Sequence, residues 1–370
     1  MGTSPDRRTP VMADVAKLAG VSPQTVSRVL NDHPRVCAET RARVVLAIER
    51  LGYRRNLTAR ALVTRHSRRL GVVSFDATRY GRAGIVFAIE QAARERGYSV
   101  SIVNLRTLDR AGIDAAVGHL AEQGVEGVVI IGPRSSATGA FGGLPEGTPA
   151  VVVEGWGTGG VPVVGVDQVE GAMLATGHLL ELGHETVWHV AGPAGWLEAD
   201  GRVQGWRAAL RAAGRQVPDV LIGDWSPRSG YQAGKLLMTL PGRVTAVFVA
   251  NDQMALGVLR ALAEAGVPVP GQVSVVGFDD IAESEFFSPP LTTVRQDFAA
   301  VARDSVDVLL AQIESDGPAE RERLAVTPQL IVRGSAAVMF DAFQEGRRPP
   351  NAVSSRVGEN SAEDAEVVGA

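Results

Sequence analysis

The sequence contains a single cysteine, Cys37, and only six histidines in 370 residues. One thiol excludes an internal disulfide and any metal site built from several cysteines. The histidines are scattered, with no pair at ligand spacing. No apolar run reaches the length of a membrane span, and the opening MGTSPDRRTP lacks the apolar stretch of a secretory signal. We therefore expect a cytoplasmic protein with no metal, cofactor or membrane partner.

Recognisable enzyme motifs are also missing. GWGTGG at 155–160 satisfies the spacing G-x-G-x-x-G, but VPVVGV after it predicts a strand instead of the helix that a pyrophosphate requires. The sequence has no P-loop, no H-E-x-x-H and no G-x-S-x-G. We expect no catalytic residues.

The net charge of −4 conceals an asymmetry along the chain. Residues 1–70 hold 14 Lys or Arg against 5 Asp or Glu, a balance of +9, and the remaining chain holds 23 against 36, a balance of −13. A basic head on an acidic body is typical of a protein that contacts a polyanion at one end.

Residues 12–30, MADVAKLAGVSPQTVSRVL, have the pattern of two short helices joined by a tight turn. Gly20 can adopt the positive φ that such a turn needs. Ser22 is a good N-cap, and Pro23 at the first helical position loses no hydrogen bond. This is the pattern of a helix-turn-helix, whose second helix enters the DNA major groove. The residues expected to be buried are Val15, Ala16, Ala19, Val26, Val29 and Leu30.

The motif DVAKLAGVSPQTVSRVLN resembles the opening of the lactose-repressor (LacI/GalR) family of bacterial transcription factors. The resemblance extends over about residues 10–335. It implies that Gln24 and Arg28 read operator bases, and their chemistry agrees, since Gln pairs with adenine and Arg with guanine. The secondary contacts expected are Ser22, Thr25 and Ser27.

A third helix is predicted over residues 38–51, ended by Gly52. Val11 and Cys37 occupy N-cap positions where residues with a better capping side chain are usual. We expect Cys37 to be a small, partly buried structural residue. The basic segment after this helix is predicted to be a linker. The resemblance implies that it forms a hinge helix on DNA, with Leu62 inserted in the minor groove; the residues expected to contribute are Asn56, Ala59 and Leu62.

From Leu70 onward, short apolar runs alternate with amphipathic stretches, which predicts parallel sheets with helices on both faces. The resemblance implies a two-lobed core like that of periplasmic sugar-binding proteins, with the helix from Phe298 crossing back to the first lobe. The expected organisation is a helix-turn-helix domain at 10–53, a hinge at 54–68, a sugar-binding and dimerisation domain at 69–339, and a disordered tail at 340–370.

Polar residues follow several predicted strands, and ligands bind beyond the carboxyl ends of strands in open α/β sheets. Carboxylates, amides and guanidinium groups engage neighbouring hydroxyls, and an aromatic ring covers the apolar face of a sugar. GDWSPRSGY, VANDQMALG, SVVGFDD and PPLTTVRQDF resemble the lactose-repressor branch of the family. The expected ligand contacts are Glu154, Arg202, Trp225, Asn251, Asp279, Gln296 and Phe298.

Several nearby residues have a structural interpretation instead. We expect Asp252 and Asp280 to be helix caps or structural hydrogen-bond partners, and Trp225 has a core role as its alternative. His178 and His184 are expected at the surface or as caps. The other four tryptophans, Trp156, Trp188, Trp196 and Trp206, are assigned to packing.

The sequence thus predicts a homodimeric repressor that binds a palindromic operator and is released by a sugar effector, for which a galactoside is the leading candidate. Two alternatives stay open: a sugar-binding protein without a regulatory role, and an activator or co-repressed regulator. The missing signal peptide and the basic head argue against the first.

Overall fold

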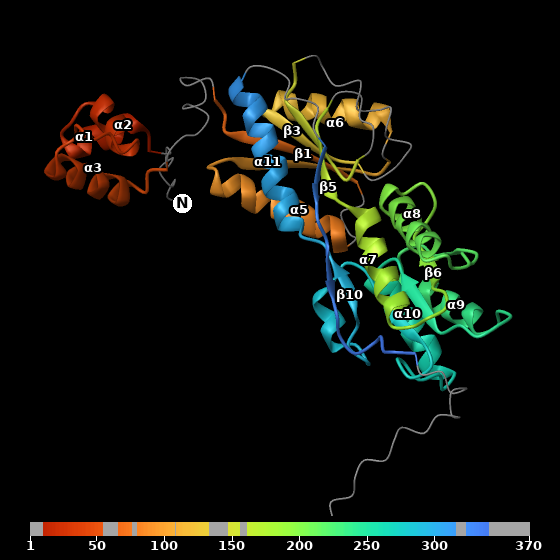
Figure 1. The fold of residues 1–370 in the computed structure, drawn as a ribbon. Coiled ribbons are helices and arrows are strands. Elements are labelled where there is room, and N and C mark those ends of the chain that lie inside the picture. The colour runs from red at the N-terminus through yellow and green to blue at the C-terminus, as the bar shows by residue number, and fades with distance from the viewer. Residues whose placement is uncertain are drawn as a thin grey trace, which may run out of the picture.

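The computed structural model describes residues 10–54, 66–75, 80–107, 109–132, 147–155, 161–315 and 323–339. The chain forms a three-helix N-terminal unit and two α/β lobes (Figure 1). None of the described helices is long and apolar enough to cross a membrane. Nor do the described residues contain a group of three or more His, Cys, Asp or Glu that could hold a metal ion.

The N-terminal unit, called the headpiece below, contains α1 (Met12–Ala19), α2 (Pro23–Leu30) and α3 (Ala38–Leu51). The predicted turn is confirmed, because Gly20 has a φ of 65° and the Ser22 hydroxyl accepts a hydrogen bond from the Thr25 amide at 3.1 Å. The predicted core is also confirmed, with Leu30 only partly buried. Ala47 and Tyr53 join this core as residues that were not predicted.

The expectation for Cys37 was wrong, because its side chain is exposed. It occupies the N-cap of α3 without accepting a side-chain capping bond, and its sulfur lies 3.1 Å from the Thr40 hydroxyl. A thiol is too weak an acceptor to hold an N-terminal amide as a hydroxyl does.

Replacing Cys37 by serine is expected to stabilise the headpiece by about 0.5–1 kcal/mol, because the hydroxyl can accept from the Thr40 amide. The headpiece amides should exchange with solvent more slowly in Cys37→Ser than in the wild type. Cys37→Ala serves as the control, since it removes the thiol without supplying an acceptor. Equal exchange in the two variants would contradict the capping explanation.

The first lobe contains a six-stranded parallel sheet in the order β11-β5-β4-β3-β1-β2. Alternate residues of each strand face opposite sides, so Val72 packs toward α5 and α11 while Val73 packs toward α6. Both faces are covered, as predicted. The elements are β1 (Arg69–Phe75), α5 (Tyr80–Glu95), β2 (Ser99–Leu105), α6 (Arg110–Glu122), β3 (Gly127–Ile131), β4 (Ala150–Val153), β5 (Val163–Val166), α11 (Phe298–Ser315) and β11 (Arg323–Val326).

The second lobe contains a four-stranded parallel sheet in the order β7-β6-β8-β9. Two helices cover each face: α7 and α8 on one side, α9 and α10 on the other. The elements are α7 (Gln168–Glu181), β6 (Trp188–Ala191), α8 (Leu197–Ala212), β7 (Leu221–Ile222), α9 (Pro227–Leu237), β8 (Ala246–Val249), α10 (Asp252–Glu264), β9 (Ser274–Val276) and the 3-10 helix η3 (Ala282–Phe286).

The chain passes between the lobes three times: from β5 to α7, from β10 (Thr293–Arg295) to α11, and from β11 to β12 (Gln329–Ile331). β10 and β12 form an antiparallel pair beside the second sheet, and the dark blue ribbon of β11 and β12 runs from one lobe to the other in Figure 1. The predicted return of α11 to the first lobe is confirmed, because Val301 and Leu309 lie in the core of that lobe.

Several details of the core differ from the sequence prediction. β10, β11 and β12 were not predicted, and β7 consists of only two residues, Leu221–Ile222. The expectation for His184 was wrong: the residue is 2% exposed, and its ring nitrogens bind the Thr245 and Ser274 hydroxyls. These partners satisfy an imidazole that would otherwise be costly to bury.

Candidate ligand-binding and DNA-binding sites

The outer face of α2 carries the candidate DNA contacts. Gln24 and Arg28 are exposed and four residues apart, so they lie on the same face of the helix. Val26 and Val29 are buried on the opposite face and fix the orientation of the helix. Ser22 and Thr25 lie close to each other at the N-terminus, with their hydroxyl oxygens 2.9 Å apart, and Ser27 is partly buried.

The turn after α2 is held by Arg41 of α3, which donates to Asp32 at 2.8 Å and to the carbonyl of His33 at 3.1 Å. The three remaining candidate DNA contacts, Asn56, Ala59 and Leu62, lie outside the described residues.

Between the two lobes, four polar side chains form a closed ring, called the interlobe ring below. Arg202 Nε donates to Gln168 Oε1 at 2.9 Å, and Gln168 Nε2 donates to Gln296 Oε1 at 2.9 Å. Gln296 Nε2 donates to Asp279 Oδ1 at 2.7 Å, and Arg202 Nη2 lies 3.6 Å from that same oxygen. Three of the predicted ligand residues are therefore brought together, with Gln168 as an unpredicted fourth member.

Glu154 is attached to this ring from the first lobe. Its carboxylate accepts from the Val166 amide at 3.0 Å and from Gln168 Nε2 at 3.3 Å. Arg202 is in the second turn of α8, which begins at Leu197. Its guanidinium also donates to the carbonyl of Ala250.

Burial strongly affects the two carboxyl groups at this site. It raises the pKa of Glu154 to about 7 and that of Asp279 to about 6, because water no longer solvates the charged forms. Glu198 adds repulsion at both groups, while Arg202 favours their ionised forms. One guanidinium thus faces three acidic side chains, so the site is poor in positive charge.

Aromatic side chains enclose the guanidinium of Arg202. Its Cζ lies 3.8 Å from the ring centre of Phe278 and 5.5 Å from that of Trp225. Trp196 contacts Trp225 edge-on, with ring centres 6.2 Å apart, and Phe75 at the end of β1 lies 6.4 Å from Trp196. Trp196, assigned to packing, is therefore next to the candidate site, and Phe75 brings the first lobe to it.

Two further predicted ligand residues, Asn251 and Phe298, are not members of the interlobe ring. Asn251 caps α10 by accepting from the Met254 amide at 3.0 Å, and its own amide donates to the carbonyl of Trp225 at 3.2 Å. Asn251 thus holds Trp225 in place. Phe298 belongs to the first-lobe side, where its ring packs against Gly81 and Gly84 of α5.

Backbone conformation marks the same positions. Glu154, Trp225 and Asp279 are non-glycine residues with φ of 57°, 72° and 109°. Such conformations cost free energy and persist where surrounding structure enforces them, commonly at binding sites. Three of the seven predicted ligand residues therefore carry strained backbone.

Asp252 and Asp280 have the structural roles that were predicted. Asp280 pairs with Arg295 and Arg333, both at 2.6 Å. Asp252 is fully buried and accepts from the Ile281 amide at 2.9 Å and the Thr293 hydroxyl at 2.6 Å.

Burial, with repulsion from Asp279, raises the pKa of Asp252 from 3.8 to about 8. Its contribution to stability is therefore greatest below its ordinary pKa and is lost as the pH rises through about 8. Asp252→Asn should consequently lose less stability than the wild type between pH 6 and pH 9, because an amide cannot ionise but can satisfy both partners. Urea denaturation midpoints at the two pH values measure this.

Asp252→Ala is the comparison, since it leaves the Ile281 amide and the Thr293 hydroxyl without an acceptor. It should cost about 1–3 kcal/mol at both pH values. An Asn variant as unstable as the Ala variant would show that the carboxylate charge itself is needed.

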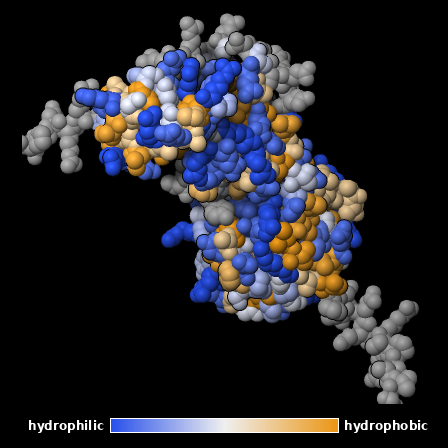
Figure 2. Space-filling model, turned by 90° about the vertical axis from the view of Figure 1, so that its left-hand side faces the viewer, coloured by the Kyte–Doolittle hydropathy of each residue, from blue (hydrophilic) through white to orange (hydrophobic). Residues whose placement is uncertain are grey.

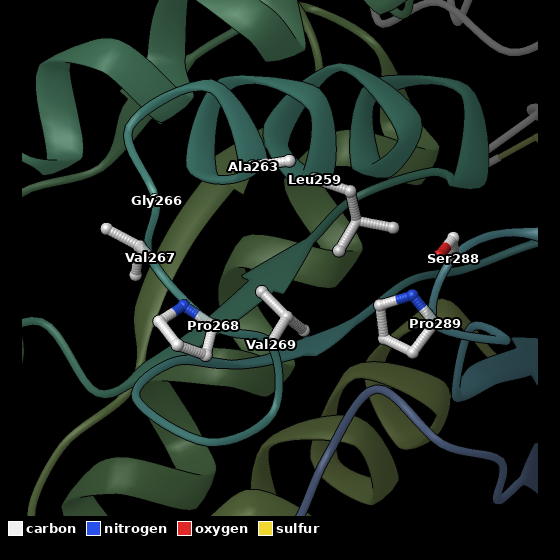
Figure 3. Close-up of a pocket in the computed structure, with 8 residues that line it drawn as sticks. All are labelled: Leu259, Ala263, Gly266, Val267, Pro268, Val269, Ser288 and Pro289. Carbon is white, nitrogen blue, oxygen red and sulfur yellow. The ribbon is translucent and has the colours of Figure 1, made fainter.

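A pocket of about 380 Å³ lies away from the interlobe ring, at the end of α10 (Figure 3). It is lined by residues 266–269, by Ser288 and Pro289, and by Leu259 and Ala263 of α10. The lining contains no charged side chain and none of the predicted ligand residues, so it lacks the paired polar groups that recognise a sugar.

Gln168 was missed, although the rule that selected the other residues could have found it. It follows Val166, the last residue of β5, after the capping residue Asp167. It therefore sits beyond the carboxyl end of a strand, as Glu154 and Asp279 do. Gln168 lies in the first turn of α7, where a glutamine side chain is usually solvated.

Comparison with known proteins agrees with both parts of the architecture. Residues 11–56 match the family described as bacterial regulatory proteins, lacI family, and residues 176–336 match a periplasmic binding protein-like domain. The ribose operon repressor of Escherichia coli (strain K12) is 32% identical over 329 residues, which cover 88% of this chain and 99% of that protein. The chain belongs to the LacI family of bacterial regulatory proteins.

Other members of the LacI family extend the comparison. The lactose operon repressor of Escherichia coli (strain K12) is 36% identical over 301 residues, covering 80% of this chain and 83% of that protein. The lac repressor dimer bound to operator and the anti-inducer ONPF superposes with a TM-score of 0.79 at 33% identity, covering 89% of this chain and all of that one. The predicted family, fold class and DNA-binding regulatory role are thereby confirmed.

Proposed function

We propose that this LacI-family regulator is a homodimeric repressor that binds a palindromic operator and releases it when a neutral, hydroxyl-rich sugar binds between the lobes. The observation that carries the proposal is the interlobe ring. It combines a guanidinium, a carboxylate and amides next to an indole, which is the set of groups that recognises adjacent sugar hydroxyls and the apolar face of a pyranose.

The electrostatics favour an uncharged ligand. Arg202 is already engaged by Gln168 and the Ala250 carbonyl and lies beside Asp279, while burial disfavours any further negative charge. A phosphorylated sugar would add charge to a site whose carboxyl groups already have raised pKa values. We therefore expect sugar hydroxyls, not phosphates, to contact Arg202 and Asp279.

Within this proposal, the sugar hydroxyls are bound by Arg202, Asp279 and Gln296. The rings of Trp225 and Phe298 stack on or flank the sugar, and Asn251 positions Trp225. Glu154 closes the site from the first lobe. A galactoside is the leading candidate. Two related structures at 33–34% identity contain small molecules: a lac repressor bound to ONPG in the repressed state, and the transcriptional regulator CelR in complex with cellobiose.

The proposed DNA contacts are Gln24 and Arg28 at base edges, with Ser22, Thr25 and Ser27 as backbone or secondary contacts. The segment 54–68 is proposed to act as the hinge, with Asn56, Ala59 and Leu62 ordered on DNA. Two headpieces are then needed at a fixed spacing, which a dimer supplies.

Exposed apolar side chains on the second lobe suit such a dimer. Phe286 is 80% exposed and Leu256 is 43% exposed, and Figure 2 shows apolar surface on that lobe. Burying such surface between two copies would be favourable. The cytoplasm is the proposed location, because the operator is there.

The test begins with an operator that the protein itself selects from random duplexes. Titrating ONPG, D-galactose, cellobiose and D-ribose 5-phosphate into the complex then measures the response. A neutral sugar should release the DNA and the phosphate should not. Tighter operator binding with sugar would indicate co-repression, and the absence of any selected sequence would refute the proposal.

A further inference from the structure

Gln168 makes three hydrogen bonds to other side chains, more than any other member of the interlobe ring. Its carbonyl oxygen accepts from Arg202, and its amide nitrogen donates to both Gln296 and Glu154. One acceptor and two N–H donors are thus all used inside a site where Gln168 is only 5% exposed.

The direction of these hydrogen bonds is fixed by chemistry. Arginine can only donate and an ionised aspartate can only accept, so the two glutamine amides between Arg202 and Asp279 have one orientation. Turning the Gln168 amide over would place its nitrogen against the Arg202 donor and its oxygen against two acceptors. The ring is therefore a directed chain of hydrogen bonds that starts and ends on the second lobe.

Two of the four members of the ring lie at the crossing segments. Gln168 begins α7 immediately after the first crossing, and Gln296 lies in the second crossing, between β10 and α11. Glu154 belongs to the first lobe, whereas Arg202 and Asp279 belong to the second. When the lobes move relative to each other, the backbone rotates at these crossings. Such a rotation changes the hydrogen bonds that Gln168 makes to Arg202, Gln296 and Glu154.

We propose that Gln168 is a positioning residue that ties two of the crossing segments together and holds Arg202, so that ligand contact with Arg202 is converted into lobe movement. The tie between crossings stands on the hydrogen bonds alone. Its consequence for sugar response rests on the proposed function.

The test compares Gln168→Met with Gln312→Met in the full-length protein. Gln312 is a matched control because it is also a buried glutamine, 7% exposed, and bonds the backbone of Ala150 inside the first lobe. Methionine keeps the volume of glutamine and removes its hydrogen bonds.

Without ligand, hydrogen exchange should be at least about tenfold faster in Gln168→Met than in the wild type at the Asp167 and Phe298 amides, which lie at the two crossings. Gln312→Met should leave these amides unchanged. Exchange at the crossings that is unchanged in Gln168→Met, or equally fast in both variants, overturns the tie.

With D-galactose and cellobiose as probes, the concentration that half-releases the selected operator should rise at least tenfold in Gln168→Met and should stay at the wild-type value in Gln312→Met. An unchanged half-release concentration overturns the role in sugar response. If the wild type responds to neither probe, the proposed function fails for these sugars, and the exchange comparison still decides whether Gln168 ties the crossings.

Gln168→Glu provides a second variant should the methionine protein not fold. A glutamate keeps the acceptor for Arg202 but places an acceptor against Gln296 and Glu154. Exchange should then increase at Phe298, where the Gln296 connection is lost, and slow exchange there would contradict the proposal.

Discussion

The Arg202→Ala variant is expected to bind its operator normally and to lose its response to sugar. Arg202 is 3% exposed and contacts Gln168, Asp279 and the faces of two aromatic rings, whereas the headpiece is a separate helical unit. The proposed contact with a sugar hydroxyl is made by a buried charged group, and removing such a group from a ligand contact costs about 2–5 kcal/mol, which corresponds to a loss of sugar affinity of at least roughly 30-fold.

The measurement is the operator affinity with and without the sugar that releases the wild-type protein, after circular dichroism has shown that the variant is folded. Arg207→Ala is the matched control, because this arginine lies on the same helix and is exposed. It should release the operator as the wild type does. Loss of operator binding in Arg202→Ala, with the fold intact, would assign Arg202 to the DNA-binding conformation instead of the ligand.

The Arg28→Ala variant should lose sequence discrimination at one base pair of each half-site. An arginine that contacts guanine contributes about 1–3 kcal/mol of discrimination, and a dimer carries the contact twice. The expected total is therefore about 2–6 kcal/mol on the preferred operator, with little change on random DNA. Competition between the selected operator and all single-base variants measures the effect.

Arg50→Ala is the control for this experiment, because Arg50 is exposed near the end of α3 and has the same charge. It should weaken all duplexes alike if it contacts phosphate, and have no effect if it contacts nothing. A specificity profile of Arg28→Ala that matches the wild type at every position would show that other residues read the bases.

The headpiece was largely predictable because its signals are local. Gly20, Ser22 and Pro23 determine the turn and the start of α2 through their own backbone and capping preferences. The exposure of Cys37 was predicted wrongly, because it depends on which other segments pack beside the N-cap of α3. The residues next to Cys37 in the sequence carry no information about that packing.

The candidate ligand site was predictable in its residue types but not in its connections. The rule that ligands bind beyond strand ends located Asp279 and Glu154, whereas the positive φ values and the bonds through Gln168 come from contacts between segments far apart in the chain. His184 illustrates the same limit, because its partners Thr245 and Ser274 are distant in sequence.

The last described stretch, residues 323–339, contributes to both lobes at once. β11 forms the edge of the first sheet beside β5, and β12 pairs with β10 beside the second sheet. Both lobes therefore gain a strand only after the rest of the core has been synthesised. A chain that stops near residue 315 would lack β11 and β12, so β5 and β10 would each lose a pairing strand. A library of shortened genes should therefore show an abrupt loss of soluble protein at that position.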